Sequence, residues 1–178
     1  MKTNTNFALP NSFDSTSEFS QVKQLFLTEL INVYTGKKHL IKFLSVLAVH
    51  ENFSASKQQL LELQDQLQLQ LEKCEKIYEQ CENEPMQKHF PEKFLTSVER
   101  FIMVKKNENA GKSLLSLIVY IKIHESKESV LFKKIKNLAQ ILGFHNCLFI
   151  LNQPSQLIVN SDDLIEQAGI LYSSKIAV

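Results

Sequence analysis

The sequence predicts an all-α protein, an antiparallel bundle of four helices with a short extra helix in the crossover between the second and third. Three observations lead to this fold class. Gly and Pro number only four each among the 178 residues, whereas turn-rich β proteins use both more often. Leu, Lys, Gln and Glu, which favour helices, dominate the chain. Several long stretches place apolar residues every three or four positions, and such helices joined by short links form antiparallel bundles.

Composition places the chain among ordinary globular proteins of one domain. Hydrophobic residues make up 44% and charged residues 22%, and this length suits a single core. The net charge of +1 gives no reason to expect nucleic acid or an anionic membrane as partner. Three cysteines without a CxxC pair indicate a reducing, cytoplasmic compartment. We see no signal-peptide pattern and no apolar run of about 18 residues, so no membrane contact is expected.

Residues 1–15 are predicted to form a flexible N-terminal tail, and residues 16–173 the helical bundle. The tail is polar, contains Pro10 and shows no period. Ser15 and Glu18 have the spacing of a capping box, so the first helix should begin there and end near residues 50–52. One stripe of this helix is apolar but carries two charges, and it comprises Val22, Phe26, Glu29, Val33, Lys37, Leu40, Leu44 and Leu47.

The second helix is predicted to begin at Ser54 or Ser56. Gln64, Gln66, Gln68 and Gln70 should occupy its other faces and contact solvent. A loop with two prolines at 83–91, a short helix at 92–105 and a polar link at 106–111 should follow. The apolar seam of the second helix, in which the cysteines are expected to be core thiols, comprises Leu60, Leu63, Leu67, Leu71, Cys74, Ile77 or Tyr78, and Cys81.

The third helix is predicted over residues 113–143, with Gly143 as the residue that ends it. A fourth helical segment covers residues 144–173, but Pro154 lies inside it. Proline removes a backbone donor, so we expect either a kink or a short helix, a break and a second helix. The stripe of the third helix holds two carboxylates between apolar ends and comprises Leu114, Leu117 or Ile118, Ile121, Glu125, Glu128, Phe132, Ile135, Ala139 and Leu142.

Acids within an apolar stripe are costly to bury unless a metal, a cation or a hydrogen-bond network meets them. Glu125 and Glu128 are such acids. The central question is therefore which group lies opposite these two carboxylates.

Three stretches carry a resemblance to a known family. The stretch LFLTELINVYTGKKHLIKFL at 25–44 is similar to the first-helix pattern of the YciE/YciF-type ferritin-like proteins. QLEKCEKIYE at 70–79 resembles the end of the family's second helix, and Glu125 and Glu128, followed by LAQILG at 138–143, resemble its third. The resemblance covers about residues 20–170. In the first helix it rests on Leu25, Phe26, Glu29, Leu30, Tyr34, Leu40 and Leu44.

This resemblance implies a ferritin-like four-helix bundle, often dimeric, with a di-metal carboxylate centre. Carried over to this chain, the ligand set is incomplete. Lys37 replaces the first-helix glutamate, and the second-helix glutamate falls at Gln66 or, with a shift of one residue, at Asp65. Ser126 replaces the histidine of the third helix, where Glu125 and Glu128 remain. Ser155, Gln156, Leu157 and Ile158 replace the acidic run of the fourth helix, where the nearest acids are Asp162 and Asp163.

Lys37 is the most informative replacement. An ammonium group at a ligand position repels a divalent ion and attracts carboxylates. We hypothesise that Lys37 supplies the counter-charge in place of a metal, in a buried cluster with Glu125, Glu128 and Glu29. The alternative is that the Lys37 side chain extends outward to solvent and that Glu125 is partly solvated.

Two classes of function follow. The first is a non-enzymatic ferritin-like bundle that has lost a complete di-iron site, holds no cofactor and acts through association, most simply as a homodimer. Leu61, Leu69, Val119 and Ile123 lie off the main stripes and need a second surface to bury them. The alternative is an iron- or manganese-binding protein with an oxidase or stress-protection role, using Glu125, Glu128, Glu29 and Asp65. No residue set points to catalysis without a metal.

Overall fold

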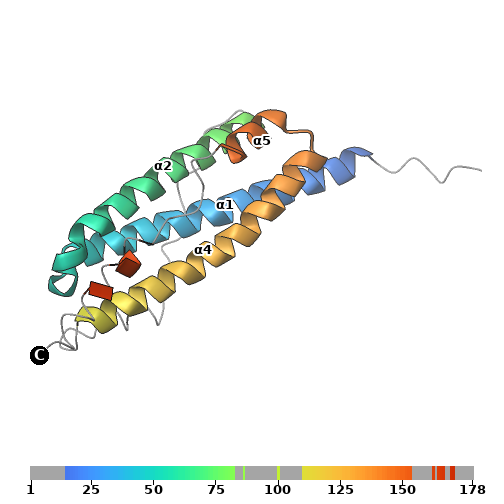
Figure 1. Cartoon of the computed structure of the whole chain (residues 1–178). Coiled ribbons are helices and arrows are strands. Elements are labelled where there is room, and N and C mark those ends of the chain that lie inside the picture. Colours follow the sequence, from blue (N-terminus) through green and yellow to red (C-terminus); the bar gives the residue numbers. More distant parts are fainter. Residues whose placement is uncertain are drawn as a thin grey trace, which may run out of the picture.

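A computed structural model describes residues 15–82, 86, 100, 110–153, 162, 164–166 and 169–170. The regular elements in this part of the chain are all helices, which confirms the all-α class. They are α1 (Ser15–Ala48), the 3₁₀ helix η1 (Glu51–Ser56), α2 (Lys57–Glu82), α4 (Ala110–Ile141) and α5 (His145–Leu151), as Figure 1 shows. None of the helices described is long and apolar enough to cross a membrane.

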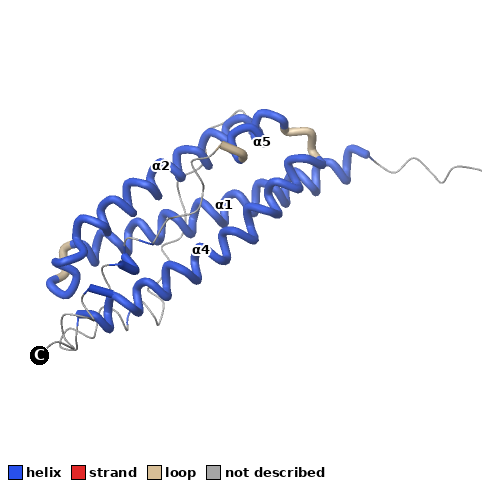
Figure 2. The backbone as a smooth tube through the Cα atoms, viewed as in Figure 1, coloured by secondary structure: helices blue, strands red, loops and turns tan. Residues whose placement is uncertain are grey.

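The three long helices lie side by side, and α1 packs against both α2 and α4. Helix α1 runs antiparallel to both of them, so α2 and α4 run in the same direction (Figures 1 and 2). Helix α2 ends and α4 begins at opposite ends of the bundle. This agrees with a crossover between the second and third long helices. The predicted short helix at 92–105 lies outside the described residues except for Arg100, which is helical.

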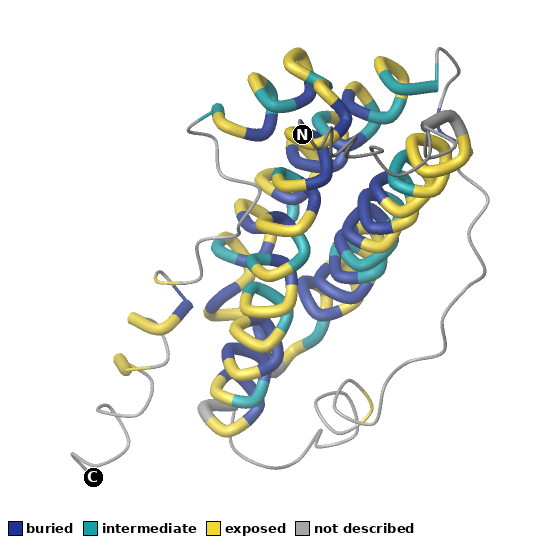
Figure 3. Tube along the Cα trace, turned by 90° about the vertical axis from the view of Figure 1, so that its right-hand side faces the viewer, coloured by how far each residue is buried: buried dark blue, intermediate teal, exposed yellow. Residues whose placement is uncertain are grey.

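The apolar stripes read from the sequence form the interior. Along each long helix, buried positions alternate with exposed ones at helical spacing (Figure 3). In α1 the stripe from Phe26 to Leu47 is buried, including both charged positions, while Val22 at its start is half-buried. Helix α2 begins directly after Ser56, which is one of its two predicted starts. The 3₁₀ turn η1, which the sequence did not suggest, closes the link between α1 and α2 and buries Phe53.

The core consists of two apolar clusters, one toward each end of the bundle. The first contains Leu40, Leu67 and Ile121 together with buried apolar residues toward the η1 end of the bundle. The second contains Tyr34, Leu71 and Phe132 together with buried apolar residues toward the α5 end of the bundle. Between them, one residue from each long helix is polar, namely Lys37, Gln70 and Glu128, which we call the polar layer. Ile41 packs against both clusters.

The fourth helical segment begins with a short helix. Helix α5 has seven residues and ends at Leu151, before Pro154. The sequence predicted either a kinked helix or a short helix followed by a break, and residues 144–153 form a short helix that ends in a turn. The described residues at 162, 164–166, 169 and 170 are helical and lie near the start of α4 (Figure 1). Leu164 is buried there in the first cluster.

Only one of the two cysteines predicted as core thiols on α2 is fully buried. Cys74 is 0% exposed, whereas Cys81 is half-buried and packs against the second cluster from its edge. Cys81 lies in the last turn of α2, which ends at Glu82.

Gly143 ends α4 as predicted. Its φ of 69° lies in the left-handed region, which costs other residues about 1–2 kcal/mol. The N–H groups of Gly143 and Phe144 donate to the carbonyls of Gln140 and Ala139, at 3.1 and 2.9 Å. This is the Schellman arrangement, which satisfies carbonyl groups in the last turn of the helix.

Replacing Gly143 and Gly36 by alanine should therefore have opposite effects. Gly143→Ala should lower the free energy of unfolding by about 1 kcal/mol, because alanine resists a positive φ. Gly36→Ala should raise it by about 0.5–1 kcal/mol, because Gly36 lies inside α1 and no atom would come within 4 Å of the added Cβ. Urea unfolding followed by circular dichroism measures both. Equal effects of the two substitutions would contradict this assignment of the α4 terminus.

Candidate functional site

The polar layer joins the three long helices at one point. Lys37 on α1 is 0% exposed. Its Nζ donates to Oε2 of Glu128 on α4 at 2.6 Å and to Oε1 of Gln70 on α2, also at 2.6 Å. The contact with Glu128 is a buried ion pair, and ionised hydrogen bonds of this length are among the strong ones in proteins. One ammonium group thus contacts both neighbouring helices.

The surroundings of the pair are apolar and exclude water. The ring centre of Phe132 lies 5.8 Å from Lys37 Nζ, close enough for a cation–π contact. Burial raises the pKa of Glu128 above its ordinary value, whereas Lys37 opposes that shift. Burial likewise raises the pKa of the Cys74 thiol to about 12, and Lys37 again opposes the shift. Burial is the larger cause of both pKa shifts, so the charged form of Glu128 is costly here without Lys37 beside it.

A second polar contact between α1 and α2 lies one turn away. The Tyr34 hydroxyl donates to Glu75 Oε1 at 2.9 Å. Burial, followed by the hydrogen bond to Glu75, raises the pKa of Tyr34 to about 12. This hydroxyl is therefore neutral in the folded protein at physiological pH and satisfies an acid at the edge of the core.

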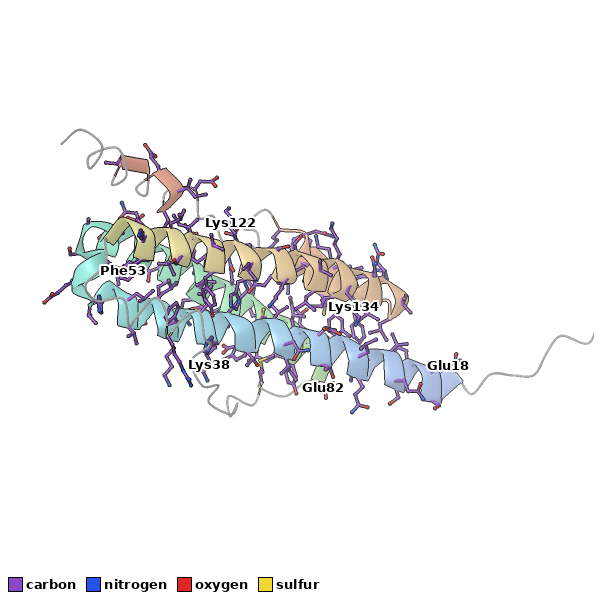
Figure 4. All side chains as sticks on the ribbon, turned by 90° about the horizontal axis from the view of Figure 1, so that it is seen from below. Glu18, Lys38, Phe53, Glu82, Lys122 and Lys134 are labelled. Atoms are coloured by element: carbon purple, nitrogen blue, oxygen red, sulfur yellow. The ribbon has the colours of Figure 1, made fainter. Side chains whose placement is uncertain are left out.

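The structure does not bring the four residues of the predicted charge cluster together at one point. Glu128 meets Lys37, but Glu29 pairs with Lys134 at 2.5 Å. Glu125 pairs with Lys122 on its own helix at 3.0 Å. Both of these lysines lie on α4, about half exposed (Figure 4).

The height of each residue along the bundle explains this arrangement. Glu29 precedes Lys37 by eight residues on α1, which is about 12 Å along a helix. Its carboxylate therefore meets a lysine at its own level instead of Lys37. The alternative in which Lys37 extends to solvent is wrong, because its side chain is fully buried.

The sequence reasoning missed Gln70. It was expected to face solvent, yet it is only 5% exposed and accepts the hydrogen bond of Lys37. A signal was present, because Gln70 follows Leu67 by three residues and precedes Cys74 by four, which places it on the apolar seam. Gln66 and Gln68 are exposed as expected. The pairing of Lys134 had no comparable signal, since it is one of several half-exposed lysines on α4.

The residues of the polar layer do not suit a divalent metal. The ammonium of Lys37 lies 2.6 Å from the Glu128 carboxylate, where it would repel a cation bound to that group. Asp65, the acid considered on α2, is exposed. Among the residues that the structure describes, no group of three or more His, Cys, Asp or Glu side chains is placed to hold an ion. The described geometry thus offers a protein cation, not a metal, to Glu128.

Comparison of the chain with protein-family models, with curated proteins and with solved structures finds no match. The ferritin-like resemblance therefore rests on the residues quoted for it.

Removing the lysine should strand a buried carboxylate. We expect Lys37→Ala to lower the free energy of unfolding by about 3–5 kcal/mol, because Glu128 would lose its charged partner in a dry site. Thermal and urea unfolding would measure the loss. A melting temperature within a degree or two of the parent's would show that the pair does not support the fold.

Two controls separate the buried pair from a general effect of charge. Lys122→Ala removes a half-exposed lysine from α4 and should cost no more than about 1 kcal/mol. The triple change Lys37→Met, Gln70→Leu and Glu128→Leu removes every polar group of the layer at similar volume. It should recover most of the stability that Lys37→Ala loses, because apolar residues often replace a buried ion pair without cost.

Proposed function

We propose that this protein is a non-enzymatic, ferritin-like helical bundle that has lost a complete di-iron site and acts by association, with a second copy of itself as the partner. One observation carries the proposal: Lys37, fully buried, binds Glu128 and Gln70 at 2.6 Å each. Lys37 and Glu128 stand at positions where the family resemblance expects metal ligands. The buried acid Glu128 thus joins α4 to α1 through Lys37.

The physical basis is that a lysine and a metal compete for the same carboxylates. Both supply positive charge inside an apolar bundle, but the lysine is part of the chain and needs no ligand exchange. With Glu29 and Glu125 also paired to lysines, the negative charge of the acidic stripe is balanced locally. A bundle of this kind has its surface, not its interior, available for interaction.

The outer face of α4 supports association. Five of its large apolar residues are 46–71% exposed, and at 100° per residue they lie within about 80° of one another. They face away from the buried side that holds Ile121, Glu128 and Phe132. We call them the α4 apolar face, which comprises Leu115, Val119, Ile123, Val130 and Ile141.

A second copy is the occupant that the surface favours. Isolated exposed apolar residues are common, but Leu115, Val119 and Ile123 follow one another at four-residue spacing, and a contiguous exposed apolar patch is typical of a contact surface. The same helix face on two copies can pack across a two-fold axis, and a net charge of +1 adds little repulsion between them. Leu61 and Leu69 on α2, also expected at an interface, are exposed as well.

A second candidate function is metal binding with an oxidase or stress-protection role, and one observation favours it. Oε1 of Glu125 is buried and has no hydrogen-bond partner among the described residues. The negative charge of Glu125 also raises the pKa of Glu128, so two carboxylates influence each other here. Iron or manganese would need both, together with Glu29 or Asp65, and would have to displace Lys37.

Metal content decides between the two functions. Protein purified without chelator, soaked anaerobically with Fe(II) or Mn(II) and desalted, should retain almost no metal by mass spectrometry, because Lys37 occupies the carboxylate. Occupancy of about one or two ions per chain would overturn the proposal and favour the second candidate. In that case Glu125→Ala should abolish retention, while Glu72→Ala, which removes a carboxylate at an exposed position of α2, should leave it unchanged.

Self-association is tested by light scattering at micromolar concentration. The parent protein should have twice the monomer mass, and Val119→Glu with Ile123→Glu should reduce it to the monomer, because buried carboxylates would face each other across the interface. Gln21→Glu with Gln24→Glu, at exposed positions of α1, makes the same change in charge and should leave the dimer intact. A monomeric parent would contradict the proposal.

A further inference from the structure

Two cysteines that are far apart in the sequence meet at one end of the bundle. Cys81 lies in the last turn of α2 and Cys147 in α5. Their sulfur atoms are 3.4 Å apart, in contact as thiols. The sulfurs of a disulfide are about 2.0 Å apart, so the bond requires only that the two side chains rotate toward each other.

The pair borders a surface cavity. Cys147 lines this cavity of about 300 Å³, together with Gln80, Gly143, Phe144, His145 and Asn146. Cys81 is half-buried and Cys147 is 3% exposed, whereas Cys74 is 0% exposed and lies in the core. The cavity is the route by which a small oxidant would approach Cys147.

The hydrogen bonds give the two thiols different roles. Cys147 Sγ lies 3.9 Å from the Ile77 carbonyl oxygen, which its thiol hydrogen contacts. Gln80 Oε1 is a second acceptor at 3.9 Å. Either sulfur can donate to the other, and Cys81 is the donor when the Cys147 thiol donates to one of these oxygens. This bond lowers the pKa of Cys147, while burial opposes the shift. Donation to Cys147, followed by burial, raises the pKa of Cys81. Cys147 is therefore the thiol that ionises first and reacts first.

Helix α5 is a short element at the end of the bundle. It has seven residues, of which Cys147 and Leu151 are buried, while Leu148 and Ile150 pack partly buried against the second cluster. Such a short element with few buried side chains opens more readily than the long helices. A covalent bond at Cys147 would tie α5 to the end of α2.

We propose that Cys81 and Cys147 form a reversible disulfide when the protein meets a hydroperoxide, and that this bond locks α5 onto the end of α2. The proposal goes beyond the association proposed above and does not depend on it. Reversible disulfides of this kind in reducing compartments serve redox sensing.

The reaction has two steps. The Cys147 thiolate attacks an oxygen of the hydroperoxide, the O–O bond breaks, and a sulfenic acid forms while the leaving oxygen takes up a proton as water or an alcohol. Cys81 then loses its proton and attacks Cys147 Sγ, so that the S–O bond breaks and water leaves. The two thiols supply the two electrons that reduce the peroxide. A thiol reductant reverses the change by thiol–disulfide exchange.

The test treats the folded full chain with hydrogen peroxide, blocks remaining thiols and maps peptides by mass spectrometry. We expect a Cys81–Cys147 peptide that disappears with dithiothreitol, and a Cys74 that stays reduced. Cys74→Ser should give the same disulfide as the parent. Cys81→Ser should accumulate a sulfenic acid on Cys147, which dimedone traps.

The locking effect has its own measurement. Amide hydrogen exchange in α5 should slow by about tenfold or more on oxidation, and the Cys81→Ser protein should show no such change. Circular dichroism confirms that each variant folds. The proposal is overturned if the folded parent forms no Cys81–Cys147 bond, if the bond appears only in denaturant, if dimedone fails to label Cys147 in Cys81→Ser, or if oxidation leaves exchange in α5 unchanged.

Discussion

The rest of the bundle depends on the ion pair between Lys37 and Glu128. Lys37 is fully buried, and a buried charge is tolerated only where partners lie in the right place. One residue of slip along α4 would turn Glu128 by about 100° and remove it from the ammonium. The same holds for Gln70 on α2. The hydrogen bonds of Lys37 to Glu128 and Gln70 are therefore made in this alignment of the three helices and lost in one shifted by a residue.

The two apolar clusters and the polar layer depend on each other. The clusters lie on both sides of the layer and keep water from it, which strengthens the hydrogen bonds of Lys37. In return, the hydrogen bonds of the polar layer oppose a shift of α2 or α4 along α1. The outer pairs, Glu29 with Lys134 and Glu125 with Lys122, contribute less, because both lysines are about half exposed and water screens them.

The buried Lys37 also changes where interactions with the bundle can take place. When the acidic stripe is neutralised by the chain itself, the features left for interaction are on the outside. The α4 apolar face extends along one side of the bundle, and the thiol pair of Cys81 and Cys147 lies at the α5 end. These features use different residues, so association and redox chemistry can be separated by substitution.

The sequence by itself determined which side of each long helix is buried. Apolar spacing of three and four placed Phe26, Leu67 and Ile135 in the core, and Gly143 marked the end of α4. The spacing also indicated that Lys37 and Glu128 face inward. Periodicity reports rotation about a helix axis, and it is reliable because a residue turns by a constant angle at each step.

Only the tertiary structure decided which inward-facing residues meet. Lys37 binds Glu128 and Gln70, Glu29 finds Lys134, and Cys81 meets Cys147. These pairings depend on the height at which one helix stands beside another, which is set by the links between helices and by packing across the whole core. No local pattern carries that height. The sequence therefore indicated that Lys37 and Glu128 face inward, but it placed Gln70 toward solvent and added Glu29 and Glu125 to the cluster.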